Sequence, residues 1–209
     1  STCSFNETKI ADASQLRRKL AGDSFGSASQ YYATELARST NAVVAMNADY
    51  YLFRDFGIVA YNRELFRFNT DSAYGYNKYN CVDTLFITSG GDFLYKRMGE
   101  QNTWDSIQQF IRDNDVLFSL GFGPVLIDGG VDVMPEQYQW GEIWDEYARS
   151  ALGMLGRHHY LTMNINCGQG EYYYLATLRQ AADAMLARGC VKAYTLDGGQ
   201  TATTVFGGE

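Results

Sequence analysis

Two glycine-rich segments, and the charged or amide side chains near them, are the parts of this sequence that could carry chemistry. Asp197 is the strongest candidate, because it ends an apolar run and stands beside Gly198 and Gly199. Glycines at such a place allow a ligand or another backbone to approach closely. A carboxylate there can stabilise a developing cation or deliver water. A turn-forming Asp-Gly pair is the alternative for the same residues.

Asn47 and Asp49 form a second candidate pair, directly after the apolar run 42–46. They are two residues apart, so both side chains project to one face of an extended segment. An Asx-turn that ends the strand is the alternative. Arg149 precedes another apolar run, where its planar guanidinium could bind an anion or form an exposed salt bridge.

Apolar periodicity predicts the elements that position these residues. Short runs rich in β-formers predict strands at 42–46, 57–61, 65–68, 84–88, 93–95, 116–120, 125–127, 151–155, 160–163, 191–196 and 202–206. Helical spacing predicts helices over 103–112 and 175–188, and a short helix is expected around 13–21. Asn47, Asp49 and Asp197 therefore follow the ends of predicted strands.

The order of these elements occurs twice, over about residues 84–130 and 150–208. Each copy has a hairpin, a helix, a strand, a glycine-rich break and a further strand. The breaks are Gly121-Phe122-Gly123-Pro124 and Asp197-Gly198-Gly199-Gln200. The pattern predicts an α+β fold with a mixed, largely antiparallel sheet, flanking helices and an internal two-fold pseudo-repeat. Both breaks should then line one pocket with Asn47 and Asp49, although each could be only a tight turn.

Length and composition exclude several classes of protein. The 209 residues suit a single structural domain, and 46% hydrophobic with 20% charged residues is typical of a globular core. A net charge of −7 argues against a nucleic-acid partner, which needs a basic face. No apolar stretch approaches the ~20 residues of a transmembrane helix. His158 and His159 are the only histidines and no Cys-x-x-Cys pair occurs, so no metal site is expected.

Four motifs follow one another in an order that resembles the phosphodiester glycosidase family. They are Asn47-Ala48-Asp49-Tyr50-Tyr51, Gly121-Phe122-Gly123-Pro124-Val125-Leu126, Arg149-Ser150-Ala151-Leu152-Gly153 and Leu196-Asp197-Gly198-Gly199-Gln200-Thr201-Ala202. Family members typically read Asn-Gly-x-Phe-Phe, Ser-Phe-Gly-Pro-x-Leu, Arg-Thr-Ala-Ile-Gly and Leu-Asp-Gly-Gly-Gly-Ser at these places. The motifs span about residues 42–208, with departures that include Ala48, Gly121 and Gln200.

The resemblance implies a hydrolase that cleaves the sugar C1–O bond of a sugar-1-phosphodiester without a cofactor, releasing free sugar and a phosphomonoester. The motif positions make Asp197, Asp49 and Arg149 the expected catalytic residues, with Arg149 holding the phosphate. The expected substrate-binding residues occupy the other motif positions: Asn47, Gly121, Gly123, Gly198, Gly199 and Thr201. The implied partner is a carbohydrate or a sugar phosphate.

Two other functions stay open at this point. Gln180 stands where the family often has a glutamate at the start of the last helix, and Gln200 replaces a glycine. The chain could therefore be a carbohydrate-binding or envelope-associated domain that kept the fold and lost turnover. It could also be a hydrolase of ordinary glycosidic links.

The N-terminal region and the cysteines give expectations about organisation and compartment. Residues 1–40 are expected to be an extension packed on a domain formed by residues 41–209. The first residues lack the charged and apolar regions of a signal peptide, so any such peptide has been removed, and a secreted or cell-envelope location is expected. Four cysteines allow three pairings; Cys167–Cys190 is the favoured disulfide, with buried free thiols as the alternative.

Overall fold

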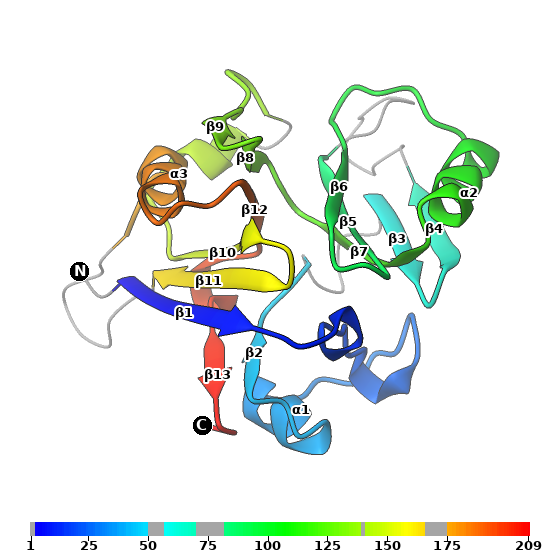
Figure 1. The fold of residues 1–209 in the computed structure, drawn as a ribbon, viewed down its shortest axis with the longest axis horizontal. Helices are drawn as coiled ribbons and strands as arrows, with labels where there is room; N and C mark the ends of the chain where they lie inside the picture. Colours follow the sequence, from blue (N-terminus) through cyan, green and yellow to red (C-terminus); the bar gives the residue numbers. More distant parts are fainter. Residues whose placement is uncertain (1–2, 50–56, 70–81, 139–140, 166–174) are drawn as a thin grey trace.

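The computed structural model describes residues 3–49, 57–69, 82–138, 141–165 and 175–209 (Figure 1). Within them, every strand pair is antiparallel. The predicted α+β class is confirmed, and each predicted strand is found within a few residues of its expected bounds. The strands are divided over more than one sheet.

The larger sheet has six strands in the order β1-β11-β10-β12-β8-β9. Their bounds are β1 (Cys3–Lys9), β11 (His159–Ile165), β10 (Arg149–Gly156), β12 (Lys192–Leu196), β8 (Val125–Asp128) and β9 (Val131–Asp132). The second sheet has five strands in the order β4-β3-β7-β5-β6. Their bounds are β4 (Glu64–Asn69), β3 (Gly57–Tyr61), β7 (Val116–Gly121), β5 (Thr84–Thr88) and β6 (Phe93–Lys96). A ribbon of β13 (Thr204–Phe206) and β2 (Val44–Met46) completes the strands.

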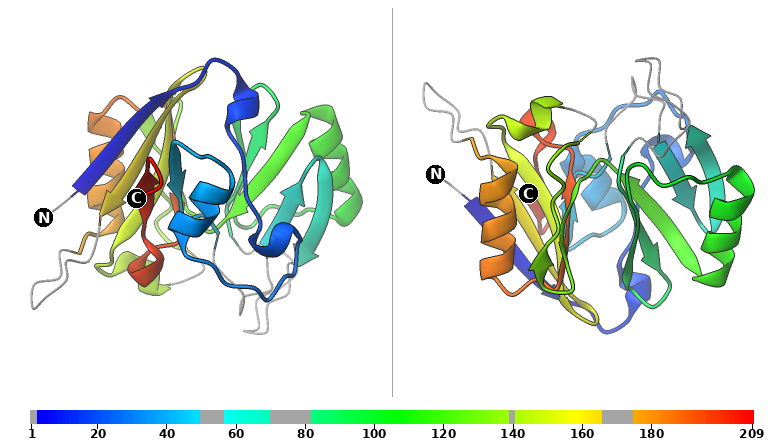
Figure 2. Two further views of the ribbon diagram at one scale, coloured as in Figure 1. Left: turned by 90° about the horizontal axis from the view of Figure 1, so that it is seen from below. Right: turned by 90° about the horizontal axis from the view of Figure 1, so that it is seen from above.

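The two sheets face each other, and a helix covers the outer side of each (Figure 2). Helix α3 (Leu178–Ala187) packs on β10, β8 and β9, whereas α2 (Trp104–Asp113) packs on β4 and β7. Each of these helices begins at a threonine, Thr177 or Thr103, whose side chain accepts a backbone N–H bond of the first turn. A third helix, α1 (Ala33–Ser39), contacts the β2–β13 ribbon.

Strand alternation explains why the apolar residues form separate layers. Leu85 and Ile87 of β5 belong to the cluster between the sheets, together with Leu152 and Tyr194 of the six-stranded sheet. Phe86, between them in sequence, points the other way and packs with α2. A third cluster fills the space under α3. The core therefore has three layers, under α3, between the sheets and under α2.

The two predicted copies share their chain order and their strand pairing. The hairpin β5–β6 precedes α2, and the following strand β7 pairs with β5; the hairpin β10–β11 precedes α3, and β12 pairs with β10. Beyond the glycine-rich breaks the copies differ, because β8 joins the six-stranded sheet and β13 pairs with β2. A two-fold relation between the copies in space stays a prediction.

The N-terminal region contains a strand that the sequence did not indicate. Residues 3–9 form β1, which pairs with β11 along its whole length. The short helix expected around 13–21 is replaced by two 3-10 turns, Ala13–Gln15 and Ala21–Asp23. Ile10 and Leu16 pack against the cluster between the sheets. This region is thus anchored to the sheet and the core, and a domain boundary near residue 40 stays a prediction.

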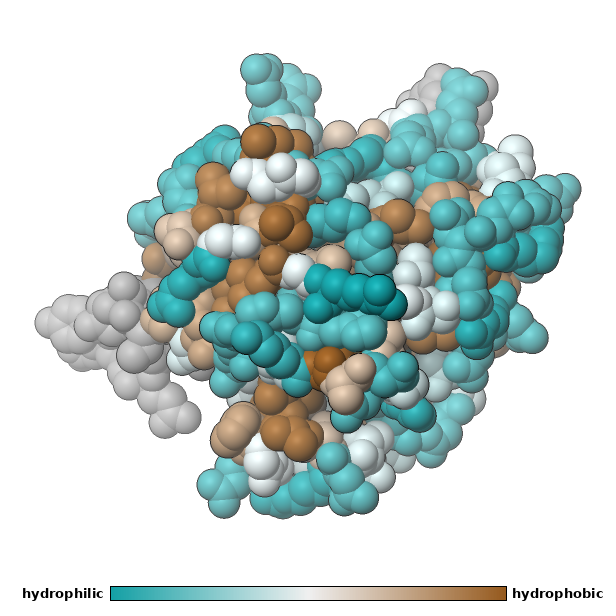
Figure 3. All heavy atoms as spheres, in the orientation of Figure 1, coloured by the Kyte–Doolittle hydropathy of each residue, from teal (hydrophilic) through white to brown (hydrophobic). Residues whose placement is uncertain are grey.

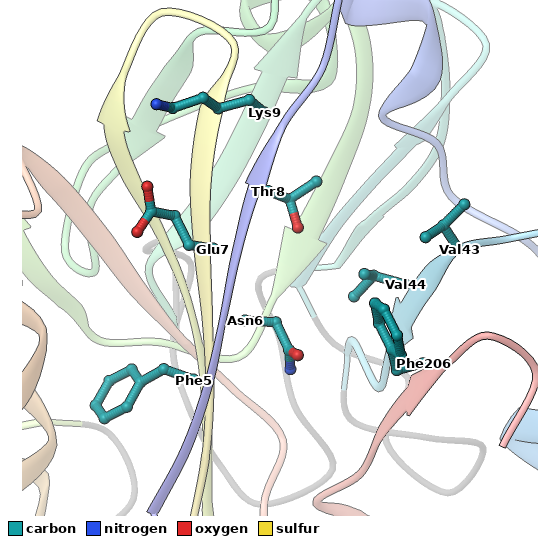
Figure 4. A pocket seen from close by; sticks show the side chains of 8 residues that line it. All are labelled: Phe5, Asn6, Glu7, Thr8, Lys9, Val43, Val44 and Phe206. Carbon is teal, nitrogen blue, oxygen red and sulfur yellow. The ribbon is translucent and has the colours of Figure 1, made fainter.

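A groove of about 340 Å³ lies between β1 and the β2–β13 ribbon (Figure 4). Asn6 and Thr8 of β1 point toward Val44 and Phe206 across it, whereas Phe5, Glu7 and Lys9 point away. Apolar surface lies over the ribbon at the lower edge of the molecule (Figure 3). None of the residues that line the groove is a candidate catalytic residue.

Two further findings concern the membrane and the cysteines. In the described ranges, no helix combines the length and the apolar character that crossing a membrane requires. Cys190 is a buried free thiol, and burial raises its pKa to about 11. The favoured Cys167–Cys190 disulfide is therefore not formed here. Cys3 is also free, and Cys81 and Cys167 lie outside the described residues.

Candidate functional site

Asp49 lies where the segment after β2 meets the end of β7. Its Oδ1 accepts a hydrogen bond from the backbone N–H of Gly121 at 3.2 Å. Its Oδ2 lies 2.6 Å from Nη2 of Arg18, whose Nη1 donates to the carbonyl oxygen of Ser119. The side chains of Arg18 and Asp49 are only 12% and 14% exposed. The carboxylate of Asp49 is thus largely buried and paired with Arg18.

Asp197 follows β12 and is bound by its own turn. Its Oδ1 accepts the backbone N–H of Gly198 at 2.8 Å, and its Oδ2 accepts the hydroxyl of Thr201 at 2.9 Å. Its backbone N–H donates to the carbonyl oxygen of Ala48 at 3.0 Å. The two candidate carboxylates therefore project from backbone segments that are hydrogen-bonded to each other, with Asp197 only 7% exposed.

Asn47 joins three parts of this site through its amide. Its Nδ2 donates to the carbonyl oxygen of Asp197 at 2.5 Å. Its Oδ1 accepts from the hydroxyl of Ser150 at 2.7 Å and from the backbone N–H of Thr203 at 3.1 Å. Ser150 in turn accepts a bond from Asn164 at 2.9 Å. This amide was predicted to bind substrate; its observed contacts fix the backbone that carries Asp197.

Arg149 is not brought to these carboxylates. Its Nε donates to the carbonyl oxygen of Ala176 at 2.9 Å, and its Nη2 donates to those of Ile143 and Asp145 at 2.8 and 2.5 Å. It neighbours Ser150 on β10, so the two side chains project to opposite faces of the sheet. The residue is 3% exposed, and burial lowers the pKa of its guanidinium to about 10. Backbone carbonyls thus accept from Nε and Nη2 of the guanidinium, and the expectation that Arg149 holds a phosphate stays a prediction.

The first break (residues 121–124) is locked by buried side chains. The hydroxyl of Tyr194 accepts the backbone N–H of Phe122 at 2.8 Å and donates to the carbonyl oxygen of Asp83 at 2.6 Å. The hydroxyl of Tyr138 donates to the carbonyl oxygen of Phe122 at 2.7 Å. The carboxylate of Asp83 accepts the N–H of Val125 at 2.8 Å, and burial raises its pKa. The protein itself therefore satisfies the polar backbone of this break.

The glycines of the two breaks have different reasons for being glycine. A Cβ on Gly123 would lie 2.1 Å from the hydroxyl of Tyr138, and one on Gly198 would lie 2.3 Å from the carbonyl oxygen of Ala148. Among the described residues, the nearest atom to a Cβ on Gly121 is 3.9 Å away, an ordinary contact, and at Gly199, where φ is +61°, none lies within 4 Å. Gly123 and Gly198 thus admit another part of the protein, whereas no described atom lies close to Gly199.

The structure brings together most of the predicted site residues. Hydrogen bonds join Asp49 to Gly121 and join Asp197 to Asn47 and Thr201, and the bond from Asp197 N–H to the carbonyl oxygen of Ala48 brings the two sets together. That this set lines a substrate pocket stays a prediction. Among the described residues, no three His, Cys, Asp or Glu side chains gather in a way that could hold a metal ion.

Sequence reasoning missed two polar residues of this set. Ser150 follows Arg149 in the third motif, and strand alternation alone could have placed it on the face opposite Arg149. Arg18 lies in a polar segment without apolar periodicity, so no pattern pointed to it. Only the fold shows that it reaches Asp49.

Comparisons with known proteins place the fold and the family. Over its whole length the chain resembles the catalytic domain of zebrafish N-acetylglucosamine-1-phosphodiester alpha-N-acetylglucosaminidase, solved in a form auto-inhibited by its pro-peptide. The TM-score is 0.70 at 18% identity, and 74% of that chain is covered. A hypothetical protein from Synechocystis matches 99% of this chain and 53% of its own, with a TM-score of 0.53 and 13% identity. None of the curated proteins matches the sequence.

The family comparison covers the four motifs. The sequence profile of the phosphodiester glycosidase family matches residues 40–209, which include Asn47, Asp49, both glycine-rich breaks and Arg149. The N-terminal segment that carries Arg18 lies before the matched range. Since the match covers most of the chain, this protein belongs to the phosphodiester glycosidase family.

Proposed function

We propose that this protein hydrolyses the sugar C1–O bond of a sugar-1-phosphodiester and releases the free sugar and a phosphomonoester. The observation that carries the proposal is the juxtaposition of Asp49 and Asp197 on hydrogen-bonded backbone segments. Membership of the family supports the reaction type. The zebrafish enzyme with the same fold is named for a sugar-1-phosphodiester, which supports the substrate class.

The proposed chemistry uses the carboxylates on the sugar. A departing phosphate is already a weak base, so the reaction needs less general-acid help than ordinary glycoside cleavage. The main tasks are to stabilise an oxocarbenium-like centre and to deliver water. Asp197 suits these tasks because Gly198 and Thr201 fix the direction of its carboxylate. Asp49 is the second carboxylate, and the space that the described residues leave beside Gly199 would admit substrate.

The alternative of a binding domain without turnover depended on Gln180 and Gln200. Gln180 caps α3: its Oε1 accepts the N–H of Thr177 at 2.9 Å, a bond that glutamate would also accept. Gln200 is exposed, and Gly198 and Thr201 donate to the carboxylate of Asp197. These bonds involve neither glutamine, so we favour turnover. We also propose a secreted or cell-envelope location, where sugar phosphodiesters of the envelope are accessible.

The test compares Asp197→Asn with Asp105→Asn, a matched change at an exposed position of α2. The substrates are a chromogenic sugar-1-phosphodiester and the aryl glycoside of the same sugar. Asparagine keeps the shape and removes the charge, so kcat for the phosphodiester should fall about 1,000-fold or more, with the circular dichroism spectrum unchanged. Asp105→Asn should stay within about twofold of the wild type.

Other outcomes of this test would decide between the alternatives. Near-wild-type kcat/KM for Asp197→Asn would remove Asp197 from the mechanism. Activity of the wild type on the aryl glycoside alone would favour a hydrolase of ordinary glycosidic links. No turnover of either substrate, together with binding of the sugar phosphate, would favour the non-catalytic domain.

A further inference from the structure

The N-terminal segment delivers an arginine to the candidate site from outside the range that the family profile matches. After β1 the chain leaves the six-stranded sheet and crosses toward the five-stranded sheet (Figure 2). The backbone N–H of Ile10 donates to the carbonyl oxygen of His158 at 3.0 Å, and Leu16 packs on the cluster between the sheets. These contacts hold residues 10–16 on both sides of a capped 3-10 turn. Arg18 follows directly and is therefore held near the core.

The guanidinium of Arg18 bridges two parts of the site. Nη2 pairs with Oδ2 of Asp49 at 2.6 Å, and Nη1 donates to the carbonyl oxygen of Ser119, two residues before Gly121. Gly121 in turn donates its N–H to the other oxygen of Asp49. A guanidinium has five N–H donors in a planar fork. Among the described residues, these two contacts leave further N–H groups of Arg18 that can donate to a phosphate oxygen.

The negative charges of the substrate and of the two carboxylates call for a cation in this site. A phosphodiester carries a negative charge and must approach two carboxylates in a protein of net charge −7. Like charges at close range repel strongly unless a cation lies between them. Arg149, the arginine of the family motif, donates to three backbone carbonyls instead. Arg18 touches Asp49 directly and lies in a partly enclosed place, where such contacts are screened little by solvent.

We propose that Arg18 is a residue of the substrate site, which holds Asp49 in position and binds the phosphate of a sugar-1-phosphodiester. The proposal rests on the proposed function for the identity of the substrate. It means that the N-terminal segment completes the site, although the family profile begins at residue 40.

The experiment uses the full chain with Arg18→Ala and Arg18→Lys. Arg17→Ala is the matched control, since Arg17 is an exposed neighbour that donates to the carbonyl oxygen of Ser14. Two readouts are taken: kcat and KM on the chromogenic sugar-1-phosphodiester, and the affinity for glucose 1-phosphate by titration calorimetry. Thermal unfolding and circular dichroism verify that each variant is folded.

We expect Arg18→Ala to raise KM and weaken glucose 1-phosphate binding by roughly 10- to 100-fold each. Arg18→Lys keeps the charge without the fork and should recover part of both losses. Added guanidinium ion should restore part of the activity of Arg18→Ala but not of Arg18→Lys. Arg17→Ala should stay within about twofold of the wild type in both readouts. A role in folding alone would not produce rescue by guanidinium ion.

Three results would overturn the proposal. Wild-type kinetics and binding in Arg18→Ala would exclude Arg18 from the site while leaving the proposed function intact. Higher activity in Arg18→Ala would mean that the arginine covers Asp49 and blocks the substrate. If Arg18→Ala does not fold, Arg18→Lys tests the proposal instead. Unchanged KM and affinity in Arg18→Lys would also contradict a phosphate contact. Conversely, Arg18-dependent binding without turnover would refute the proposed function and leave the arginine's role standing.

Discussion

The two glycine-rich breaks are alike in sequence and differ in what holds them. The first break, residues 121–124, is bound by the hydroxyls of Tyr194 and Tyr138. Both tyrosines are buried. The second break, residues 197–201, is bound by its own Asp197 and Thr201 and by the carbonyl oxygen of Ala148, with Gln200 exposed. The first break is bound by side-chain hydroxyls of the core, whereas the second combines bonds of its own side chains with backbone contacts to Asn47, Ala48 and Ala148.

This difference indicates a structural role for the first break and a chemical role for the second. A backbone whose polar groups are satisfied by buried hydroxyls is rigid and offers little to a ligand. A turn that carries a carboxylate at the edge of the core can present that carboxylate to a substrate. The N–H of Gly121 links the first break to the carboxylate of Asp49. We infer that the first break positions Asp49, whereas the second break carries the reacting carboxylate, Asp197.

Among changes to the glycines and the residues that hold the two breaks, the largest effect is expected from a methyl group in the second break. In Gly198→Ala the new Cβ would lie 2.3 Å from the carbonyl oxygen of Ala148, so the turn must shift and Asp197 with it. A displacement of about 1 Å can cost roughly 100-fold in rate, and we expect kcat/KM to fall by at least this factor. Unfolding in urea should show a loss of about 1–3 kcal/mol from overpacking.

Gly121→Ala is the control, because its Cβ would find no atom closer than 3.9 Å and its N–H would still reach Asp49. Activity within a few-fold of the wild type is expected. If Gly121→Ala loses more activity than Gly198→Ala, the assignment of roles to the two breaks is wrong.

The next effect concerns the lock on the first break. Tyr194→Phe removes a hydroxyl that accepts the N–H of Phe122 and donates to the carbonyl oxygen of Asp83. Two buried backbone groups are left without that partner, so the free energy of unfolding should fall by about 2 kcal/mol. Kinetic constants of the folded variant should change less than those of Gly198→Ala.

Tyr95→Phe is a matched control in the same core. The rings of Tyr95 and Tyr194 stack with centroids 6.4 Å apart. The hydroxyl of Tyr95 is buried and finds no hydrogen-bond partner among the described residues, and burial raises its pKa. Removing it should leave stability unchanged or raise it slightly. Equal losses in the two variants, measured by chemical denaturation, would contradict a specific lock on the first break.

How far the sequence could go is clear from particular residues. Short apolar runs rich in β-formers located β5, β7, β10 and β12 closely, because strands that are covered on both faces consist almost entirely of buried residues. They could not show that Leu85 and Phe86 face different layers of the molecule, since that depends on which elements cover each side. β1 was missed because an edge strand with polar neighbours, such as Asn6 and Thr8, carries little apolar signal.

The same limit applies to the site. Asp49 and Asp197 could be proposed because they follow strand ends and stand in recognisable motifs. The sequence could not show the direction of the Arg149 side chain, since a shift of one residue along β10 moves a side chain to the other face of the sheet. Arg18 could not be found because its contact with Asp49 spans 31 positions and depends on the path of an irregular segment.

The smallest effect is expected at Gln200, in the second break. Gln200→Gly restores the residue that the resemblance leads us to expect there. The side chain is exposed within the 3-10 turn Gly199–Thr201, and the bonds that hold Asp197 come from Gly198 and Thr201. Removing the side chain should therefore change kcat/KM by less than about threefold and lower stability by roughly 0.5–1 kcal/mol through added chain entropy. A tenfold or larger gain in kcat/KM, with Gly198→Ala still inactive, would mean that Gln200 restricts entry to the second break. In that case, the difference between the breaks would lie in access as well as in what holds them.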